Sequence, residues 1–428
     1  MREMQLNLKI KKEGERMNHF YRPLSLIERT YIVKEPTNNY PFAVQLVCEG
    51  IGSLVRADWV LAFEQVMKVN PSVCVKRQGK LRFSGLFVIE PDYNFLIKEY
   101  HQVAWNAHNG VSADFLETDL DISLGQGFQI VLVQGTEQDP SQKYIVFRIH
   151  HALTDVGGLM IIMRNFFLAL NGQPLVLENS LVKDEDILLK HRVKMQWFKK
   201  NAMAIAGVKP QSDQLTWLWQ REKIPAKNDQ LLISLMEAIE KASDIFSCEK
   251  KLMRFRITFD LRKYLEKDVV STANLTNAFD IDIEPNVTRQ ALKLKIMAAF
   301  RARLPLQRIP KWLVFIAGFI PEYWMAIKEP TMRKTHQQGR YFRTGTVSVL
   351  PKAIDLTELS YRDFSCQSLF GIPGPYRILS CFIAAAQMPT HIELTVGMPE
   401  MLASQAELQK ITQVIAQHLH PKREDKTG

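Results

Sequence analysis

Three segments of different character follow one another between residues 143 and 170. Lys143–Ile149 is a strand-length run rich in β-branched and aromatic residues, which suits a buried strand. His150–Gly158 is a polar turn that ends in two glycines, and Leu159–Leu170 is an apolar segment of helical length. A buried strand that turns directly into an apolar helix restricts the chain to architectures in which strands and helices pack on one another.

The same alternation runs through the rest of the chain. Strands are predicted near residues 41–49, 81–89, 128–133 and 252–259, helices near residues 54–69, 231–246 and 407–419, and further apolar segments near residues 273–283, 344–350, 378–386 and 392–397. Interleaved strands and helices predict an α/β fold. A chain of 428 residues is long enough for two units of this kind.

We place the two units at residues 1–180 and 181–428. The second unit starts with a connecting region at about 181–230, which is rich in charged residues, tryptophan, glycine and proline. One helical face in this region is shared by Ile187, His191, Met195, Phe198 and Ala202. The spacing predicts an amphipathic helix, which either packs on the protein itself or lies on a membrane.

The net charge indicates which classes of partner to expect, and the cysteines indicate the cellular compartment. The chain has 55 lysines and arginines against 45 aspartates and glutamates, so its net charge is +10. This surplus suits anionic lipid or a polyanionic substrate, and no sequence signature indicates nucleic-acid binding. The five cysteines stand singly, and residues 1–17 lack the apolar run of a secretory signal. We therefore expect a cytoplasmic protein in reducing surroundings.

One apolar segment raises the question of membrane contact. Trp312–Pro321 is too short to span a bilayer, which takes about 20 apolar residues. The longer stretch Ile309–Ile327 combines aliphatic residues with Trp312, Tyr323 and Trp324. Two interpretations stay open: a pair of core helices, or a peripheral contact with the inner face of the membrane.

The polar turn carries a specific spacing. His150 and His151 are followed, four residues after the second histidine, by Asp155 in the pattern HHxxxD. This pattern resembles the active-site signature HHxxxDG of the CoA-dependent acyltransferase superfamily. That superfamily includes chloramphenicol acetyltransferase, condensation domains of nonribosomal peptide synthetases and the wax ester synthase/diacylglycerol acyltransferase group. Val156 stands where the family usually has glycine directly after the aspartate, and Gly157 follows one place later.

Other segments fit the same family in order. Pro23–Glu28 resembles the early PLSxxx element, and Phe259–Arg262 is similar to the strand-ending "vDLR" segment. Ser271–Asn277 occupies the position of the "GN" segment without its glycine, and Thr344–Val347 is similar to the late "NLG" strand without its asparagine. The resemblance extends from about Tyr21 to Leu419.

The resemblance implies a fold and a candidate general base. The fold is an α/β sandwich of two chloramphenicol-acetyltransferase-like subdomains joined in a V, with a central tunnel that admits donor and acceptor from opposite faces. In that family the second histidine faces the tunnel, which makes His151 the candidate general base. A neutral imidazole can take a proton from an attacking hydroxyl or amine near pH 7.

The same resemblance assigns supporting residues. Asp155 is expected to orient the site and to pair with Arg262, with Arg148 as the alternative partner. His150 is assigned to structure, because neighbouring strand residues point to opposite faces. Gly157 and Gly158 let the backbone bend before the helix.

Neither a metal nor a cofactor is expected. The histidine pair and Asp155 lack further ligands at zinc spacing. The acyl-CoA or acyl-carrier protein enters as a substrate rather than as a bound cofactor.

Three functions remain open on the sequence. The leading one is a free-standing acyltransferase of lipid or secondary metabolism, which moves an acyl group from a CoA or carrier-protein thioester to a hydroxyl acceptor that could be lipid-like. The second is a condensation-like N-acyltransferase that forms an amide from an amine acceptor and a carrier-bound donor. The third is a non-catalytic binding scaffold, which Val156 and the missing asparagine before Gly345 would suit.

Overall fold

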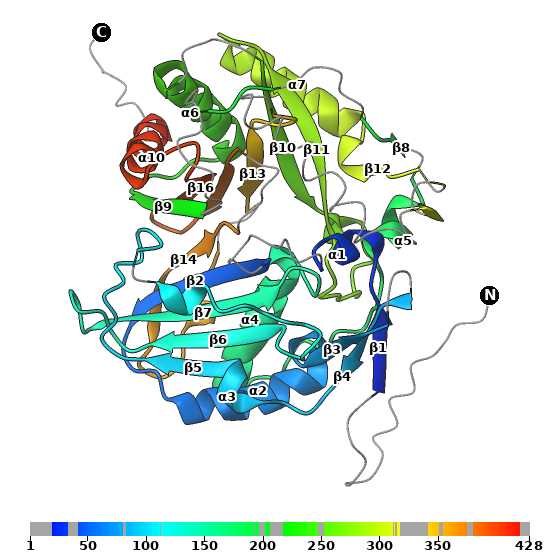
Figure 1. The fold of residues 1–428 in the computed structure, drawn as a ribbon, viewed down its shortest axis with the longest axis vertical. Coiled ribbons are helices and arrows are strands. Elements are labelled where there is room, and N and C mark those ends of the chain that lie inside the picture. Colours follow the sequence, from blue (N-terminus) through cyan, green and yellow to red (C-terminus); the bar gives the residue numbers. More distant parts are fainter. Residues whose placement is uncertain are drawn as a thin grey trace.

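Two large β-sheets, one in each half of the molecule, meet at a central junction (Figure 1). The structure is a computed structural model, and it describes residues 19–32, 42–79, 83–111, 113–191, 193–196, 202–205, 217–246, 252–310, 312, 315–316, 341–350, 354–374 and 380–419. Strands and helices interleave along the chain, as the sequence predicts.

The sheet of the first half has five strands in the order β14-β2-β7-β6-β5. These strands are β2 (Ala43–Ile51), β5 (Ile97–Tyr100), β6 (Phe128–Val133), β7 (Gln142–His150) and β14 (Ser365–Ile372). Neighbours are antiparallel except for the parallel pair β5–β6. Since β14 pairs with β2, segments from both sides of residue 180 share this sheet. The division of the chain at residue 180 stays a prediction.

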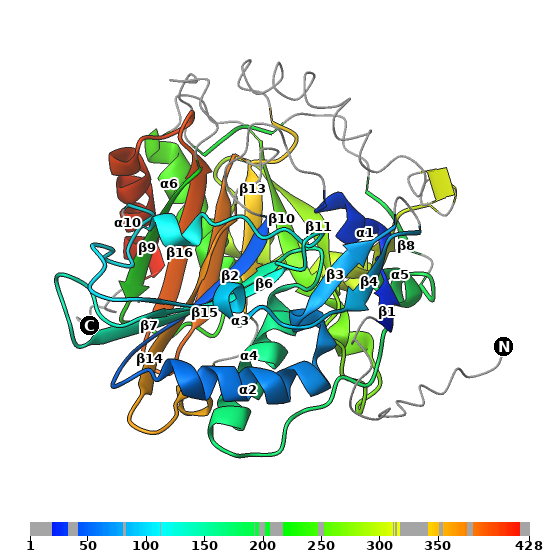
Figure 2. The same cartoon turned by 60° about the horizontal axis from the view of Figure 1, so that its bottom comes forward.

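Helices α2 (Arg56–Val69) and α4 (Val156–Leu170) cover one face of this sheet (Figure 2). Trp59 of α2 and Phe166 of α4 are fully buried, and their ring centroids lie 5.9 and 5.7 Å from that of Phe147 on β7. Aromatic side chains bury a large apolar area each, so this cluster holds the strand and the helix together. The strand, turn and helix predicted for this part of the chain are confirmed, except that α4 begins at Val156. Gly157 and Gly158, which were expected to bend the backbone before the helix, therefore lie in its first turn.

Smaller elements complete the first half. A three-stranded sheet has the order β1-β4-β3. Its strands and the short helices of this half are β1 (His19–Pro23), β3 (Val75–Gln78), β4 (Gly85–Val88), α1 (Leu26–Thr30) and α3 (Tyr93–Leu96).

The sheet of the second half has six strands in the order β11-β10-β13-β15-β16-β9. These strands are β9 (Trp217–Ile224), β10 (Met253–Asp260), β11 (Thr276–Ile283), β13 (Gly345–Val349), β15 (Phe382–Gln387) and β16 (Ile392–Pro399). The pairs β10–β13 and β13–β15 are parallel, and the others are antiparallel.

Among the described residues, the longer helices of the second half are three in number. They are α6 (Leu231–Phe246), α7 (Arg289–Arg301) and α10 (Gln405–Leu419). Helices α6 and α10 lie side by side (Figure 1), and their buried residues share one core with those of β10, β15 and β16.

The predicted amphipathic helix between Ile187 and Ala202 is wrong. Helix α5 (Asp184–Leu188) ends early, and the chain continues into β8 (Val193–Lys194). Strand β8 pairs with β12 (Gln307–Arg308). That pairing uses backbone groups that a continued helix would have bonded internally, so tertiary pairing overrides the helical spacing. Phe198, which belonged to the predicted face, lies outside the described residues.

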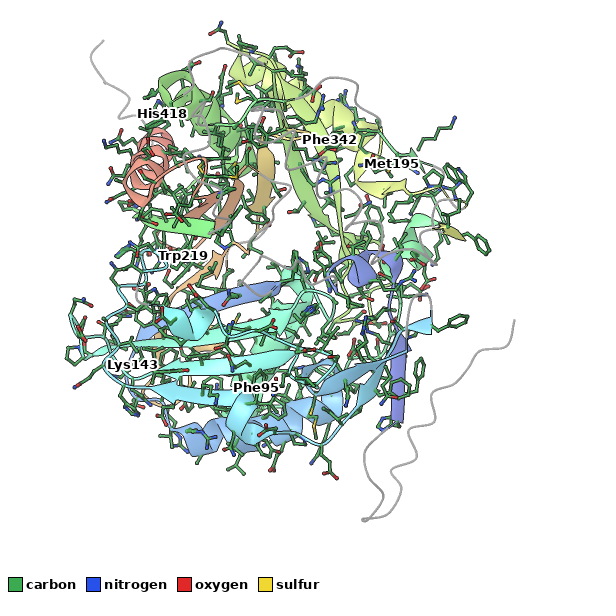
Figure 3. All side chains as sticks on the ribbon, viewed as in Figure 1. Phe95, Lys143, Met195, Trp219, Phe342 and His418 are labelled. Carbon is green, nitrogen blue, oxygen red and sulfur yellow. The ribbon has the colours of Figure 1, made fainter. Side chains whose placement is uncertain are left out.

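The predicted connecting region at about 181–230 also needs a correction, because it contains strand β9. Trp219 of β9 packs against Trp105 of the first half, with ring centroids 6.4 Å apart. Figure 3 shows Trp219 where the two halves meet. Strand β9 therefore belongs to the second sheet and also joins the halves.

The apolar stretch 309–327 lies largely outside the described residues, and neither interpretation of it is tested. Among the helices of the described ranges, none is long and apolar enough to cross a membrane.

Candidate active site

A cavity that is partly open to solvent lies at the junction of the two sheets. Its walls come from β2 and β14 of the first sheet and from β13, β15 and β16 of the second. Most of the lining is apolar, with alanines, glycines and aliphatic side chains on both sides. His151, the first residue after β7, also lines this cavity. That the cavity is open at two ends remains a prediction.

Backbone and side-chain groups hold the ring of His151 in one orientation. Its Nδ1 lies 3.2 Å from the carbonyl oxygen of Thr154. The ring stacks on Tyr31 with centroids 4.0 Å apart and planes 8° from parallel. Asn274 donates from its amide Nδ2 to the carbonyl oxygen of His151 at 3.0 Å, and the same Nδ2 lies 3.1 Å from Nδ1.

Two neighbours of Nδ1 favour opposite tautomers of His151. The carbonyl oxygen of Thr154 can only accept, which favours a proton on Nδ1, whereas the amide nitrogen of Asn274 can only donate, which favours a lone pair there. In the tautomer that bonds to Thr154, the lone pair is on Nε2, and the ring can act as a base at that nitrogen.

Burial also keeps the imidazole neutral. Removal from water lowers the pKa of His151 below its ordinary value, and backbone carbonyls and the carboxylates of Asp155 and Glu28 partly oppose this. The net direction is downward, so the neutral form of the ring prevails at pH 7.

Asp155 stands at the N-terminus of α4 and receives several donors. One carboxylate oxygen accepts from the backbone N–H of Gly158 at 2.8 Å, which caps the helix. The other accepts from the N–H of Leu275 at 2.7 Å and the hydroxyl of Thr276 at 2.8 Å. Asp155 also forms an ion pair with Arg262, with 2.8 Å between oxygen and nitrogen. The structure therefore contains the predicted contact with Arg262 and, in addition, a helix cap by the same carboxylate.

Arg262 is held as tightly as its partner. It donates to the carbonyl oxygens of Ser271 at 3.0 Å and Ala273 at 2.6 Å, and to Asp260 at 3.1 Å. Burial acts against the charged form, but Asp155 and Asp260 outweigh it and raise the pKa of Arg262 above its ordinary value. The guanidinium thus ties the second half of the chain to the turn after β7.

The two glycines make room for this guanidinium. A Cβ at Gly157 would lie 2.6 Å from Nη1 of Arg262, and a Cβ at Gly158 would lie 2.5 Å from the carbonyl oxygen of Thr272. Both distances are shorter than a van der Waals contact. The glycines therefore allow the second half to pack directly on the start of α4.

The segment that resembles PLSxxx supports the same turn. Ser25 and Glu28 form a capping box at the start of α1. Glu28 also forms an ion pair with Arg22 at 2.8 Å and accepts from the backbone N–H of Asn274 at 3.1 Å. Arg22 in turn donates to the carbonyl oxygen of Leu153 at 2.9 Å. Three segments that are distant in sequence thus converge around His151.

His150 and Arg148 lie away from this chemistry. His150 is buried and accepts a hydrogen bond from the N–H of Ala152 at 3.1 Å. Burial lowers the pKa of His150 to about 4. Arg148 donates to the carbonyl oxygens of Leu116 and Thr118 at 2.6 and 2.7 Å, and so it is not the partner of Asp155. Arg262, rather than Arg148, takes that place.

A second network of charged residues borders the cavity at Glu393. Arg221 of β9 forms ion pairs with Glu393 of β16, at 2.7 Å, and with Glu49 of β2. Ser368 of β14 and His391 also bond to the carboxylate of Glu393. Burial alone would raise the pKa of Glu393, but Arg221 and the hydrogen bonds lower it to about 2. This network, too, joins the two sheets.

Sequence reasoning missed some of these residues. Asn274 lies in the segment that resembles "GN", so its place in that pattern was a signal for a role beside the histidine. Tyr31 and the network around Arg221 had no local signal, since Arg221 is 172 residues from both of its carboxylate partners. Within the described ranges, no group of three or more histidines, cysteines, aspartates or glutamates could hold a metal ion.

Solved structures share this fold along nearly the whole chain. A substituted form of the starter condensation domain of rhizomide synthetase RzmA, in complex with C8-CoA and Leu-SNAC, matches with a TM-score of 0.63 at 14% identity, over 94% of this chain and 93% of that chain. The condensation domain from Monacolin K polyketide synthase MokA matches with a TM-score of 0.59 at 11% identity, over 94% and 97% of the two chains.

At such low identity these matches show the fold alone, and they confirm the predicted α/β condensation-like architecture. No protein-family model matches the sequence, and no curated protein matches it either.

Proposed function

We propose that this chain is an acyltransferase, which moves an acyl group from a CoA or carrier-protein thioester to a hydroxyl acceptor with His151 as general base. One observation carries the proposal. The imidazole of His151 lines a largely apolar cavity between two sheets, and a proton on Nδ1, shared with the carbonyl oxygen of Thr154, would leave the lone pair on Nε2.

The step balances without a further reactant. The hydroxyl oxygen attacks the thioester carbonyl carbon while Nε2 of His151 takes the hydroxyl proton. The new C–O bond forms, the C–S bond breaks, and the leaving sulfur takes the proton from the imidazolium. The products are an ester and a free thiol. General-base help of this kind contributes roughly 10²–10⁴-fold, and alignment of the two substrates in one cavity adds to it.

Asp155 and Arg262 act as positioning residues in this proposal. Neither lines the cavity, but together they fix the turn that carries the histidine against the second half of the chain. Asn274 and Tyr31 hold the ring directly. The expected contribution of these residues is to orient the base rather than to contact the substrates.

The polar groups of the cavity favour a neutral acceptor. Among the described lining residues, the only carboxylate is that of Glu393, which is already paired with Arg221 and bonded to Ser368. An ammonium group that entered here would find no carboxylate to balance its charge, and burying an unpaired charge is costly. An alcohol meets no such cost.

Amide formation is the second candidate function, and a specific observation supports it. The rhizomide synthetase domain that shares this fold is in complex with C8-CoA and Leu-SNAC, and leucine carries an amino group. An amine that arrives uncharged could use the same base in the same way.

The experiment offers the purified protein acyl-CoA donors of 2, 8 and 16 carbons together with 1-octanol or octylamine. Free thiol and the mass of the product are measured over pH 5–9. We expect thiol release that requires an acceptor, an ester as the main product, and an acidic limb of the rate profile below pH 6.5, because the pKa of His151 is lowered.

Two variants make the result decisive. His151→Ala should abolish transfer, whereas His101→Ala, which removes an exposed histidine that does not line the cavity, should not change it. Faster reaction with octylamine would replace the ester proposal by the amide one. No acceptor-dependent thiol release with any donor, or full activity in His151→Ala, would refute the catalytic role and favour a binding scaffold.

A further inference from the structure

Helix α7 presents apolar side chains on two opposite faces. Leu292, Ile296 and Ala299 recur at i, i+4 and i+7 and are buried against the second sheet. On the opposite face, Leu294 is 53% exposed and Met297 is 39% exposed, one turn apart. The outward face of a helix on a globular protein is normally polar, so these two residues need a reason to be there.

The sequence around this helix is strongly basic. Residues 285–321 contain seven lysines and arginines and not one aspartate or glutamate. Single exposed apolar residues are common on protein surfaces, but an apolar stripe inside a stretch without any acidic residue is not. Trp312 and Phe315, in the same stretch, are 64% and 62% exposed.

The positive charges of α7 flank the apolar stripe and are only partly neutralised. Lys295 pairs with Glu284, and Arg289 pairs with Glu237. In the described part of the chain, Lys293 and Arg301 form no ion pair. Helical geometry places Arg301 on the same face as Leu294 and puts Lys293 at its edge.

From these observations we infer that the outward face of α7 binds the surface of an anionic lipid bilayer. Leu294 and Met297 would enter the boundary between headgroups and acyl chains, and Lys293 and Arg301 would contact the anionic headgroups. A helix with basic residues around an apolar stripe, together with nearby exposed aromatic residues, has the features of an interfacial membrane helix. This inference goes beyond the proposed acyl transfer and does not depend on it.

The apolar stripe distinguishes a bilayer from other anionic partners. A nucleic acid would use the positive charges but offers no apolar layer to bury Leu294 and Met297. An acidic carrier protein is the competing occupant. Burial of apolar side chains in a bilayer persists at high salt, whereas attraction between exposed charges is screened.

The test measures co-sedimentation of the full chain with vesicles of phosphatidylcholine alone or with 30% phosphatidylglycerol, at 0.1 and 0.5 M NaCl. We expect binding to the anionic vesicles, reduced but measurable at the higher salt. Lys293→Gln combined with Arg301→Gln should weaken binding about 25-fold at 0.1 M NaCl, since each basic residue near an anionic surface contributes roughly fivefold. Leu294→Asn combined with Met297→Asn should remove the binding that persists at 0.5 M NaCl.

Matched variants keep the test falsifiable. Leu61→Asn removes a leucine that is 58% exposed on α2, and Lys241→Gln with Arg164→Gln removes two exposed charges on other helices. These variants should bind vesicles as the unaltered protein does. The inference would be overturned if the α7 variants bound vesicles as well as the unaltered protein does, or if the unaltered protein did not bind anionic vesicles. If the α7 variants bound vesicles normally but transferred acyl groups more slowly from a carrier-bound donor, this face would be assigned to the carrier protein instead.

Discussion

Two histidines lie in charged networks that join the sheets, but only one of them borders the cavity. His151 is partly exposed there, and its Nδ1 faces a backbone carbonyl. His391 is 4% exposed, and side chains bond to both of its nitrogens: Thr390 at Nδ1, and Ser368 and Glu393 at Nε2. His391, whose two ring nitrogens are both bonded to side chains, can stabilise the junction between the sheets, whereas His151 can also contact a substrate in the cavity.

Arg221 and Arg262, the arginines of the two networks, differ in the groups that surround them. Arg221 lies between two carboxylates, those of Glu49 and Glu393, and its guanidinium carbon is 3.8 Å from the ring centroid of Phe370. Asp155 has backbone and hydroxyl donors besides Arg262. Arg262 likewise contacts two carboxylates, those of Asp155 and Asp260, and Glu393 has further bonds from Ser368 and His391. The networks differ in burial, because the side chain of Asp260 is 34% exposed, whereas those of Glu49 and Glu393 are 16% and 1% exposed.

The largest difference should appear between the histidines. His151→Gln is expected to lower the rate of acyl transfer about 100- to 10,000-fold, since it removes the base, with little change in stability. His391→Gln should keep the rate per folded molecule and lower the free energy of unfolding by about 1–2 kcal/mol through lost buried hydrogen bonds. Thiol-release kinetics and urea unfolding of both variants test this, and matching losses of rate would contradict the division of roles.

The arginines should differ in stability. Arg221→Met leaves Glu49 and Glu393 close together without a cation, so we expect a loss of about 3–5 kcal/mol in the free energy of unfolding. Arg262→Met should lose less, because Asp155 keeps three neutral donors and Asp260, the second carboxylate, is partly exposed to water. Urea unfolding at pH 7 compares the two, and equal losses would show that the other donors of Asp155 do not compensate.

Acid should weaken the Arg221 network in a defined range. The pKa of Glu393 is about 2 in the folded protein, below its ordinary value of 4.5 in an unfolded chain. The stability that this group contributes is therefore complete above pH 4.5 and is lost as the pH falls toward 2, by about 3 kcal/mol. Glu393→Gln should show a shallower decline in this range. Unfolding curves from pH 2 to 6 measure it, and parallel declines would refute the assignment.

The smallest effect concerns the ring that stacks on His151. Tyr31→Ala should lower the transfer rate about 2- to 12-fold, which corresponds to the 0.5–1.5 kcal/mol of an aromatic pair, and should raise the pKa seen in the rate profile as water reaches the imidazole. Tyr31→Phe keeps the stack and should behave as the unaltered protein. A purely structural role would lower stability in the alanine variant without moving the pH profile.

Local patterns explain what the sequence could predict. The strand, turn and helix around His150–Gly158 are encoded by neighbouring residues, and the contact of Asp155 with Arg262 came from a resemblance that places both at known points of a motif. The roles of these residues in catalysis stay predictions. The α/β fold followed from the alternation of strand-like and helix-like segments.

The errors come from long-range contacts. Strand β9 lies in the region 181–230, whose charged residues, tryptophans, glycine and prolines suggested a connection. The ion pairs of Arg221 with distant carboxylates cannot be seen in the local sequence. The helix expected beyond Leu188 failed because β8 pairs with β12, more than 100 residues further on. Tyr31 meets His151 only through the packing of α1 beside the turn after β7.

The late arrival of β14 in the first sheet has a consequence for synthesis of the protein. Until the ribosome has passed residue 372, β2 is an open sheet edge with unsatisfied backbone groups, although the rest of that sheet has long been made. Open edges of nascent chains invite pairing with other chains. A fragment that stops at residue 180 should therefore aggregate, and during translation this half would benefit from a chaperone until its last strand emerges.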